Sequence, residues 1–383
     1  MPLHFDHAEY AGRRTATAKG LAAAGLDGLL MFRQESMYYL TGYDTFGYVF
    51  FQCLVMTADG RTALLTRAPD RRQAELTSTV EDIRVWVDAP DADPALQLRA
   101  LLEELGLRGS RLGVEYEAYG LTARNGKRLE AALAGFATLA DASWLVTRQR
   151  LVKSPAEIAF VRQAAALADD ALDAALPLAK PGGGEAEILA AMQGAVIRGG
   201  GDDPANEFII GSGPQALLCR YYSGRRNLDA QDQLTLEWAG VYRHYHAAMM
   251  RTIPIGSLPA VQQNLHAVAR DALLAVEAAL TPGQPVGAAF DAHARVIDAA
   301  GFGDARMNAC GYSLGAVFAP NWMDWPMLYH GNPVLVEPGM VFFCHMILFD
   351  DASGLAMSLG RTSLISATGA EPLSRGTLDL ITG

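Results

Sequence analysis

LEWAGVYRHYHAAMMRT, residues 236–252, is the stretch from which the fold can be worked out, because its residue types predict two strands around a turn. The first strand, expected at 234–238, carries one carboxylate, Glu237, and the second, expected at 244–253, carries His244 and His246. A carboxylate among apolar strand residues is costly to bury unless it is paired or used, so Glu237 is the first candidate functional residue. The hairpin is compatible with a metal site, with a site that works without metal, or with a core hairpin that has no chemistry.

Outward from the hairpin, the sequence predicts helices followed by mostly antiparallel strands. The clearest signal is a capping box, in which Ser154 caps a helix, Pro155 fills its first position and Glu157 follows three residues after the cap. Helices are expected at 155–176, 185–198, 260–280 and 286–300, and strands at 207–210, 234–238, 244–253, 341–349 and 362–366. This order is typical of an α+β domain, which we place at 149–383.

Residues 1–148 have a different pattern, in which helical and strand-like segments alternate. Helices are expected at 7–24, 94–105 and 121–133, and strands at 28–32, 49–57, 62–66 and 111–115. The tripeptide Ala58-Asp59-Gly60 marks a turn between two of these strands. Alternation of this kind predicts an α/β domain.

The composition argues against several classes of protein and of partner. Of the 383 residues, 50% are hydrophobic and 19% are charged, as in soluble globular proteins. The net charge is −11 and no dense Lys/Arg run occurs, so neither nucleic acid nor a membrane is an expected partner. No apolar run reaches membrane-spanning length, and the first residues lack the apolar core of a secretory signal. The cysteines show no CxxC spacing, so disulfides and structural zinc are not expected and the cytoplasm is the expected location.

Several phrases occur in one order along the second part of the chain. They are RLVKSPAEI (150–158), IIGSGPQAL (209–217), LEWAGVYRHYHAAMMRT (236–252), LTPGQPVGAAFDA (280–292), CGYSLGAV (310–317) and VEPGMVF (336–342). Together they resemble the pita-bread family of aminopeptidase P, prolidase and creatinase. The resemblance implies a pita-bread (creatinase-like) fold for 149–383 and a creatinase-like α/β domain for 1–148.

The resemblance also implies where metal ligands would stand. The metallopeptidases of this family hold two metal ions with two Asp, one His and two Glu, and those places fall here on Glu237, Ala248, Tyr312, His345 and Arg361. Divalent ions in sites of this kind need several carboxylate oxygens. One carboxylate remains, one place holds a methyl group and one holds a permanent cation. We therefore expect no metal and no other cofactor.

Some members of the family are hydrolases that work without metal, and the sequence is most similar to that branch. Creatinase hydrolyses a guanidino compound, and ectoine hydrolase opens a cyclic amidine. Features of ectoine hydrolase resemble Glu237-Trp238-Ala239-Gly240, Tyr245-His246, the segments Thr41-Gly42-Tyr43-Asp44 and Gln52-Cys53, and the pairs Asn321-Trp322 and Asp324-Trp325. One position departs from the pattern. A histidine expected to handle protons in both hydrolases is Arg220 here, and arginine cannot act as a base near neutral pH.

The resemblance and the residue types together assign candidate roles. The residues expected to act in catalysis are Glu237, His345 and His246. The residues expected to bind the substrate are Arg220, Arg361, Tyr312, Phe50, Gln52 and Trp322. An aromatic cage around a cation could also include Phe46 and Tyr48. An arginine close to Glu237 would keep its carboxyl group ionised at neutral pH.

Each assignment has a structural alternative. Glu237 could form a buried ion pair with Arg361 or Arg220, and Arg361 could be a structural salt bridge in a vacated metal site. The histidines could be satisfied core residues, with His246 a stronger candidate than His244 because the family resemblance favours it. An aromatic stripe is more often explained by core packing than by ligand binding.

The expected function is metal-independent hydrolysis of a C–N bond in a small amino-acid derivative that bears an amidine or guanidine and a carboxylate. Glu237 would hold the cation or attack the amidine carbon, and a histidine would move the proton. The alternatives are another ring-opening or ring-closing reaction on the same scaffold in a biosynthetic pathway, a non-catalytic binding protein and, opposed by Ala248 and Arg361, a metallopeptidase. The resemblance to creatinase implies a homodimer in which the N-terminal domain of one chain caps the site of the other.

Overall fold

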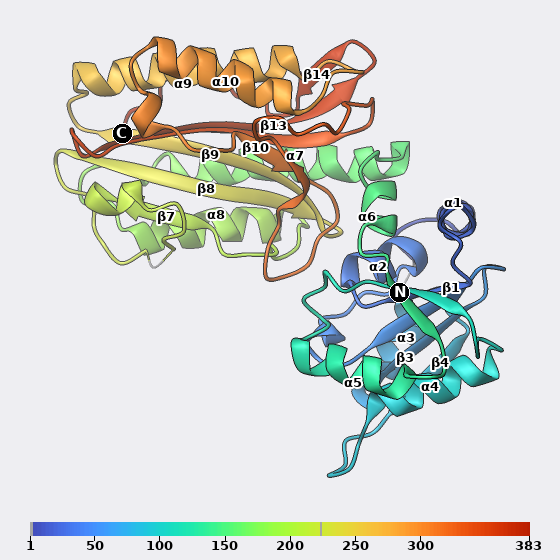
Figure 1. The fold of residues 1–383 in the computed structure, drawn as a ribbon. Coiled ribbons are helices and arrows are strands. Elements are labelled where there is room, and N and C mark those ends of the chain that lie inside the picture. Colours follow the sequence, from blue (N-terminus) through green and yellow to red (C-terminus); the bar gives the residue numbers. More distant parts are fainter. Residues whose placement is uncertain (1–2, 223) are drawn as a thin grey trace. The chain divides into compact units, whose positions relative to one another are not determined.

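The computed structural model describes residues 3–222 and 224–383, which divide into two compact units, Met1–Arg150 and Leu151–Gly383 (Figure 1). The sequence placed the boundary at 148/149. Within the described ranges, no helix combines the length and apolar character needed to cross a membrane. The two units are described separately below.

The N-terminal unit is an α/β structure built on a six-stranded mixed sheet of order β4-β3-β2-β1-β5-β6. Its strands are β1 (Gly28–Met31), β2 (Cys53–Thr57), β3 (Thr62–Arg67), β4 (Asp82–Trp86), β5 (Arg111–Val114) and β6 (Thr138–Asp141). Its helices are α1 (His7–Ala24), α2 (Gln34–Thr41), α3 (Arg71–Thr77), α4 (Pro94–Glu104), α5 (Ala123–Leu133) and α6 (Leu145–Gln149). Two apolar clusters, one on each side of the sheet strands, form its core.

Helix α2 was not predicted, because it is buried on every side and therefore has no amphipathic period. A buried carboxylate from elsewhere in the unit completes its N-terminus. Glu115, directly after β5, accepts hydrogen bonds from the backbone N–H groups of Phe32 and Arg33 and from the hydroxyl of Ser36. A cap supplied from so far along the chain leaves no local sequence signal.

The C-terminal unit is a curved antiparallel sheet covered by helices (Figure 1). The strand order is β11-β10-β12-β13-β9-β8-β7, with β14 paired to β13. The strands are β7 (Ile209–Ser212), β8 (Asp232–Tyr242), β9 (Tyr245–Ile255), β10 (Gly311–Ser313), β11 (Asp324–Met327), β12 (Val341–Asp350), β13 (Leu355–Ser366) and β14 (Gly369–Pro372). The helices are α7 (Pro155–Ala175), α8 (Glu185–Arg198), α9 (Ala260–Ala279) and α10 (Gly287–Ala299). The expected α+β order of helices and strands is confirmed.

The capping box before α7 is confirmed, since the Ser154 hydroxyl accepts from the Glu157 N–H and the Glu157 carboxylate accepts from the Ser154 N–H. The hairpin turn differs from the prediction. Strands β8 and β9 pair as far as Tyr242 with Tyr245, so Arg243 and His244 alone form the turn. Their φ angles are 50° and 65°, as a tight hairpin turn requires. His244 therefore lies in the turn and not in the strand expected at 244–253.

One face of the sheet carries the helices, and we call it the helix face. The indole N–H of Trp238 in β8 donates to the Ala168 carbonyl of α7, and the Arg361 guanidinium in β13 binds Glu277 of α9. Trp238 and Arg361 share this face because side chains alternate along a strand and paired residues point the same way. The connecting register pairs are Leu236 with Arg251 and Arg251 with Leu359.

The opposite face, which we call the pocket face, brings together residues from five strands. They are Glu237 (β8), Ala248 (β9), Tyr312 (β10), His345 (β12) and Gly360 (β13). The register pairs that place them on one face are Glu237 with Met250, Met250 with Gly360, Gly360 with His345, and Tyr312 with Phe343. The register of these strands thus brings the candidate residues to one face of the sheet.

Candidate active site

A cavity of about 160 Å³ opens on the pocket face of the C-terminal unit. Its lining residues are Asn206, Ile209, Cys219, Arg220, Glu237, Met307, Ala309, Tyr312, Asn321, Trp322, Met323, Met327, His345 and Ile347. Glu237, Arg220, Tyr312, Trp322 and His345 were predicted site residues, so the structure brings these five together.

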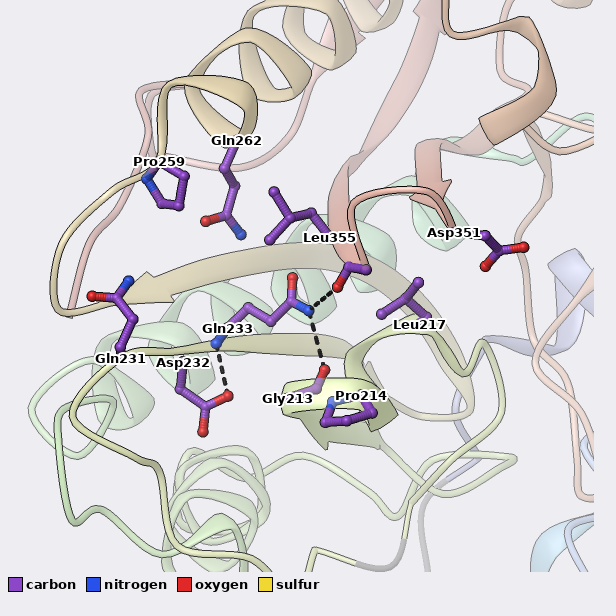
Figure 2. Close-up of a pocket in the computed structure, with 11 residues that line it drawn as sticks. Gly213, Pro214, Leu217, Gln231, Asp232, Gln233, Pro259, Gln262, Asp351 and Leu355 are labelled. Atoms are coloured by element: carbon purple, nitrogen blue, oxygen red, sulfur yellow. Dashed lines mark hydrogen bonds between the residues drawn. The ribbon is translucent and has the colours of Figure 1, made fainter.

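A larger cavity, of about 560 Å³, lies where β8 begins and α9 begins (Figure 2). The side-chain amide of Gln233 links three segments of the cavity wall. Its NH2 group donates to the carbonyls of Gly213 and Gly354, and its oxygen accepts from the Ala356 N–H. None of the predicted site residues is among the described residues that line this second cavity. The smaller cavity is therefore the candidate active site.

Glu237 is half-buried in the middle of β8 and faces the candidate cavity. Burial raises the pKa of its carboxyl group to about 7, although a hydrogen bond from Tyr312 and the positive charge of Arg220 act in the opposite direction. An arginine close to Glu237 was expected to keep the carboxyl group ionised, and with a pKa of about 7 the group is only partly ionised at neutral pH. Arg220 is exposed, so solvent weakens its effect, and Arg361 lies on the other face of the sheet.

Tyr312 links Glu237 to the wall of the cavity. Its hydroxyl donates a hydrogen bond to Glu237 Oε1 at 3.3 Å and accepts one from the indole N–H of Trp322 at 2.8 Å. Burial raises the pKa of the Tyr312 phenol well above its usual range, and the carboxyl group of Glu237 adds to that effect. Tyr312 is therefore a neutral hydrogen-bond donor at physiological pH.

His345 reaches the cavity from β12 and is 8% exposed. Burial lowers the pKa of its imidazole to about 4, so the ring is neutral at physiological pH. Its ring packs beside those of Tyr312 and Phe343, and within the part of the chain that the structure describes its buried Nδ1 has no hydrogen-bond partner. The buried Nδ1 is out of reach of a ligand, so a substrate would meet the part of this neutral ring that lines the cavity.

His246 was predicted to move protons, and the structure gives it a structural role instead. Its Nδ1–H donates to the His244 carbonyl at 2.8 Å, and its Nε2 accepts from the Ala205 N–H at 3.0 Å. Both ring nitrogens are thus used by the backbone, and burial lowers the pKa of the imidazole to about 3. His244 stacks on Phe318 at the hairpin turn.

Arg361 was predicted to hold a substrate carboxylate and to occupy a former ligand place, and both predictions are corrected by the register of β13. Its Nε and Nη2 donate to the two carboxylate oxygens of Glu277 at 2.8 and 2.7 Å, inside the layer between sheet and helices. Because alternation puts successive residues on opposite faces, the neighbours of Arg361 that lie on the pocket face are Gly360 and Thr362. The alternative of a structural salt bridge describes Arg361 correctly.

Phe50 and Gln52 were predicted to bind substrate, and they lie in the N-terminal unit. The amide of Gln52 is buried and donates to Gln34 Oε1 at 2.9 Å, so it is used inside that unit. Phe50 is 41% exposed and its ring lies under the guanidinium of Arg67. Phe46 is exposed and Tyr48 is buried. These four side chains do not line the candidate cavity.

Several lining residues were not singled out from the sequence. Asn206 precedes β7, Cys219 precedes Arg220, and three methionines, Met307, Met323 and Met327, form much of the remaining wall. Strand β11, which carries Met327, is four residues long and contains Pro326, so it was not predicted. Met307 stands in a loop before β10 with no periodic neighbours.

The residues on the pocket face do not fit the two-metal centre that the family resemblance implies. The described residues hold no group of three or more His, Cys, Asp or Glu side chains placed to bind one metal ion. Ala248 and Gly360 offer no donor atom. A Cβ atom at Gly360 would lie 2.8 Å from the ring of Phe343, so that ring fills the space over position 360.

Comparison with known proteins identifies both units. The model of metallopeptidase family M24 matches residues 159–366, and the creatinase/prolidase N-terminal domain matches residues 13–152. The expected fold, a creatinase-like α/β domain followed by a pita-bread domain, is confirmed by these matches and by the solved structures below.

Two curated relatives and two solved structures illustrate the similarity. An uncharacterized hydrolase/peptidase of Sinorhizobium fredii is 28% identical over 99% of this chain and 98% of its own length. Ectoine hydrolase of Halomonas elongata is 28% identical over 98% and 97%. The prolidase structure from Thermococcus sibiricus has a TM-score of 0.87 at 18% identity, covering 98% of this chain and 99% of its own. Dipeptidase PepE from Mycobacterium ulcerans has a TM-score of 0.85 at 24% identity, covering 99% of both chains.

Proposed function

The chain belongs to metallopeptidase family M24, and we propose that it is a hydrolase that cleaves, without metal, a C–N bond in a small amidine or guanidine that also carries a carboxylate. The observation that carries the proposal is the state of Glu237. The family's first ligand place holds a carboxyl group whose pKa is raised to about 7 by burial. A carboxyl group that titrates near neutral pH can take up and return a proton within one reaction cycle. A carboxylate that served as a metal ligand would have to stay ionised.

In the proposed reaction, ionised Glu237 accepts a proton from a water molecule while the water oxygen bonds to the amidine carbon. The C–N bond then breaks, and the leaving nitrogen takes the proton that Glu237 holds. Tyr312 donates a hydrogen bond to Glu237 in its ionised form. Neutral His345 lines the cavity and contacts the substrate there. Each proton is thus accounted for by groups that already face the cavity.

Features of the cavity support a small substrate with a cationic and an anionic end. A volume of about 160 Å³ is small beside typical sites for larger ligands, which favours a compact molecule over a peptide. Glu237 attracts the amidinium, and the guanidinium of Arg220 can bind a carboxylate in a bidentate way. The methionine side chains offer an adaptable apolar wall for the body of the substrate. The similarity to ectoine hydrolase over 98% of the chain supports the same substrate class.

The test is a hydrolysis assay with ectoine and a series of guanidino acids, run in excess chelator, beside Xaa-Pro dipeptides with added Mn²⁺. We expect one or more amidines or guanidines to be hydrolysed at a rate that chelator does not change, and elemental analysis to find no stoichiometric metal. Glu237→Gln keeps the shape of the side chain and should lower kcat/KM at least about a hundredfold, or roughly 2.7 kcal/mol.

Two results would overturn the proposal. One is metal-dependent cleavage of the dipeptides with no turnover of the amidines, which would make the chain a peptidase. The other is a folded Glu237→Gln variant, verified by circular dichroism, that keeps near-normal turnover of its substrate.

A further inference from the structure

We propose that Trp322 is a positioning residue, whose indole N–H occupies a lone pair of the Tyr312 hydroxyl and thereby directs the hydroxyl proton to Glu237. The proposal deepens the proposed function, on which its importance for catalysis rests. Trp322 was expected to contact substrate as part of an aromatic cage. Its polar atom is instead used inside the wall of the cavity.

The direction of the hydrogen bonds follows from the chemistry of the three groups. An indole N–H can only donate, so the Tyr312 oxygen must accept the bond from Trp322, which is 2.8 Å long. The single hydroxyl proton of Tyr312 is then free to go to its other neighbour, Glu237 Oε1, at 3.3 Å. Without the indole, the hydroxyl could rotate or accept a proton from a protonated Glu237.

Trp322 is itself held in place from two sides. Its backbone N–H donates to Asn206 Oδ1 at 3.0 Å. The residue is only 2% exposed, so its indole ring is packed inside the protein. The neighbouring residue Ala205 donates its N–H to His246, whose ring lies 6.4 Å from that of Trp322. The hairpin turn and the two loops at 205–206 and 321–323 thus brace one another, which fixes the direction of the indole N–H.

The consequence for Glu237 is a preference for its ionised form. A hydrogen bond donated to a carboxylate favours the charged state. A donor that itself accepts a hydrogen bond is polarised and donates more strongly. Trp322 therefore acts against the effect of burial on Glu237 through the hydroxyl of Tyr312.

The test follows the titration of Glu237 directly, so it needs no substrate. Glutamate labelled with ¹³C at the carboxyl carbon is followed by NMR against pH, and the Glu237 signal is assigned by its loss in Glu237→Gln. In Trp322→Phe we expect the acid dissociation constant of Glu237 to fall about threefold to tenfold, the range for losing part of one hydrogen bond. Tyr312→Phe should lower it at least as much.

The double variant separates positioning from a general structural effect. If Trp322 acts only through Tyr312, Trp322→Phe combined with Tyr312→Phe should titrate like Tyr312→Phe alone. Trp86→Phe is the matched control. It removes another buried indole hydrogen bond of 2.8 Å, to the Phe51 carbonyl in the N-terminal unit, and should leave the titration of Glu237 unchanged.

Two outcomes would overturn the inference: a Glu237 titration that is the same in Trp322→Phe as in the native protein, or additive shifts in the double variant. If Trp322→Phe does not fold, benzothienylalanine introduced at position 322 replaces the N–H with sulfur at nearly constant shape and gives the same readout. Failure of the proposed function would look different, because the titration would follow the pattern above while no amidine or guanidine was hydrolysed.

Discussion

Each face of the C-terminal sheet is in contact with one shielded glutamate, and the two carboxyl groups differ in how many hydrogen bonds they receive. On the helix face, Glu277 receives two hydrogen bonds from Arg361 and one from the Ser363 hydroxyl. On the pocket face, Glu237 receives one bond of 3.3 Å from Tyr312, and the pKa of its carboxyl group rises to about 7. The carboxylate of Glu277, whose charge is paired with an arginine, helps to hold the structure together. The carboxyl group of Glu237, which has fewer hydrogen-bond partners, can change its protonation state and so take part in chemistry.

The largest effect is expected from breaking the matched pair on the helix face. Arg361→Met leaves Glu277 buried without a cation and should lower the free energy of unfolding by about 3–5 kcal/mol. Urea denaturation measures the loss. The double variant Arg361→Met with Glu277→Met is the control, because replacing both partners with apolar residues should restore much of the stability. An Arg361→Met variant with native stability and weakened substrate binding would return Arg361 to the role first predicted for it.

The next largest effect is the dependence of the free energy of unfolding on the ionisation of Glu237, on the pocket face. The pKa of Glu237 is near 7 in the folded chain and near 4.5 when exposed, so the folded state binds the proton more tightly. This contribution is fully present below the unfolded value and is lost as pH rises through about 7. Glu237→Gln does not ionise, so relative to the native protein it should gain about 3 kcal/mol between pH 4 and pH 8.

Unfolding titrations in urea at both pH values would measure that difference for Glu237→Gln. Glu277→Gln is the comparison on the other face, where loss of the charge removes partners from Arg361 and should destabilise the protein at pH 8. A stability difference between Glu237→Gln and the native protein that does not change with pH would contradict the assignment of a raised pKa to Glu237.

The smallest effect sharpens the contrast between two arginines. Arg220 is exposed at the cavity, so Arg220→Met should change the free energy of unfolding by no more than about 0.5 kcal/mol. The same change should raise KM about tenfold, or roughly 1.4 kcal/mol, because the partner for the substrate carboxylate is lost. Arg225→Met, another arginine in the same segment that does not line the cavity, is the control for KM. If Arg220→Met lost as much stability as Arg361→Met, Arg220 would be a structural residue like Arg361 and not a substrate-binding one.

The sequence predicted the elements whose signals are local. The capping box at Ser154, the helix 185–198 and the apolar strand from Val341 all lie where expected. The hairpin turn was misplaced because Arg243 and His244 adopt positive φ without the glycine or asparagine that would mark such a turn. Helix α2 and strand β11 lack the periodicity that sequence reasoning depends on.

For the candidate site, the sequence predicted Glu237, Tyr312 and His345 because each aligns with a family ligand place on a strand whose face is set by alternation. It erred at Arg361 by one residue, and one residue changes the face of a strand. The partner of Arg361 is Glu277, 84 residues away in the chain, and no local pattern links them. The use of both His246 nitrogens by the backbone likewise depends on where the 205–206 loop packs.

The ring of Phe343 over Gly360 also limits how this scaffold could change through single substitutions. A carboxylate introduced at 360 would collide with that ring, since even a Cβ atom would lie 2.8 Å from it. Exchanging Phe343 alone for a smaller residue would open a void beside His345 and lose packing without providing a ligand. Placing a metal ligand at 360 would therefore require changes at both Gly360 and Phe343, each of which is unfavourable alone. Such sign epistasis makes the present arrangement a local optimum that selection one residue at a time would not readily leave.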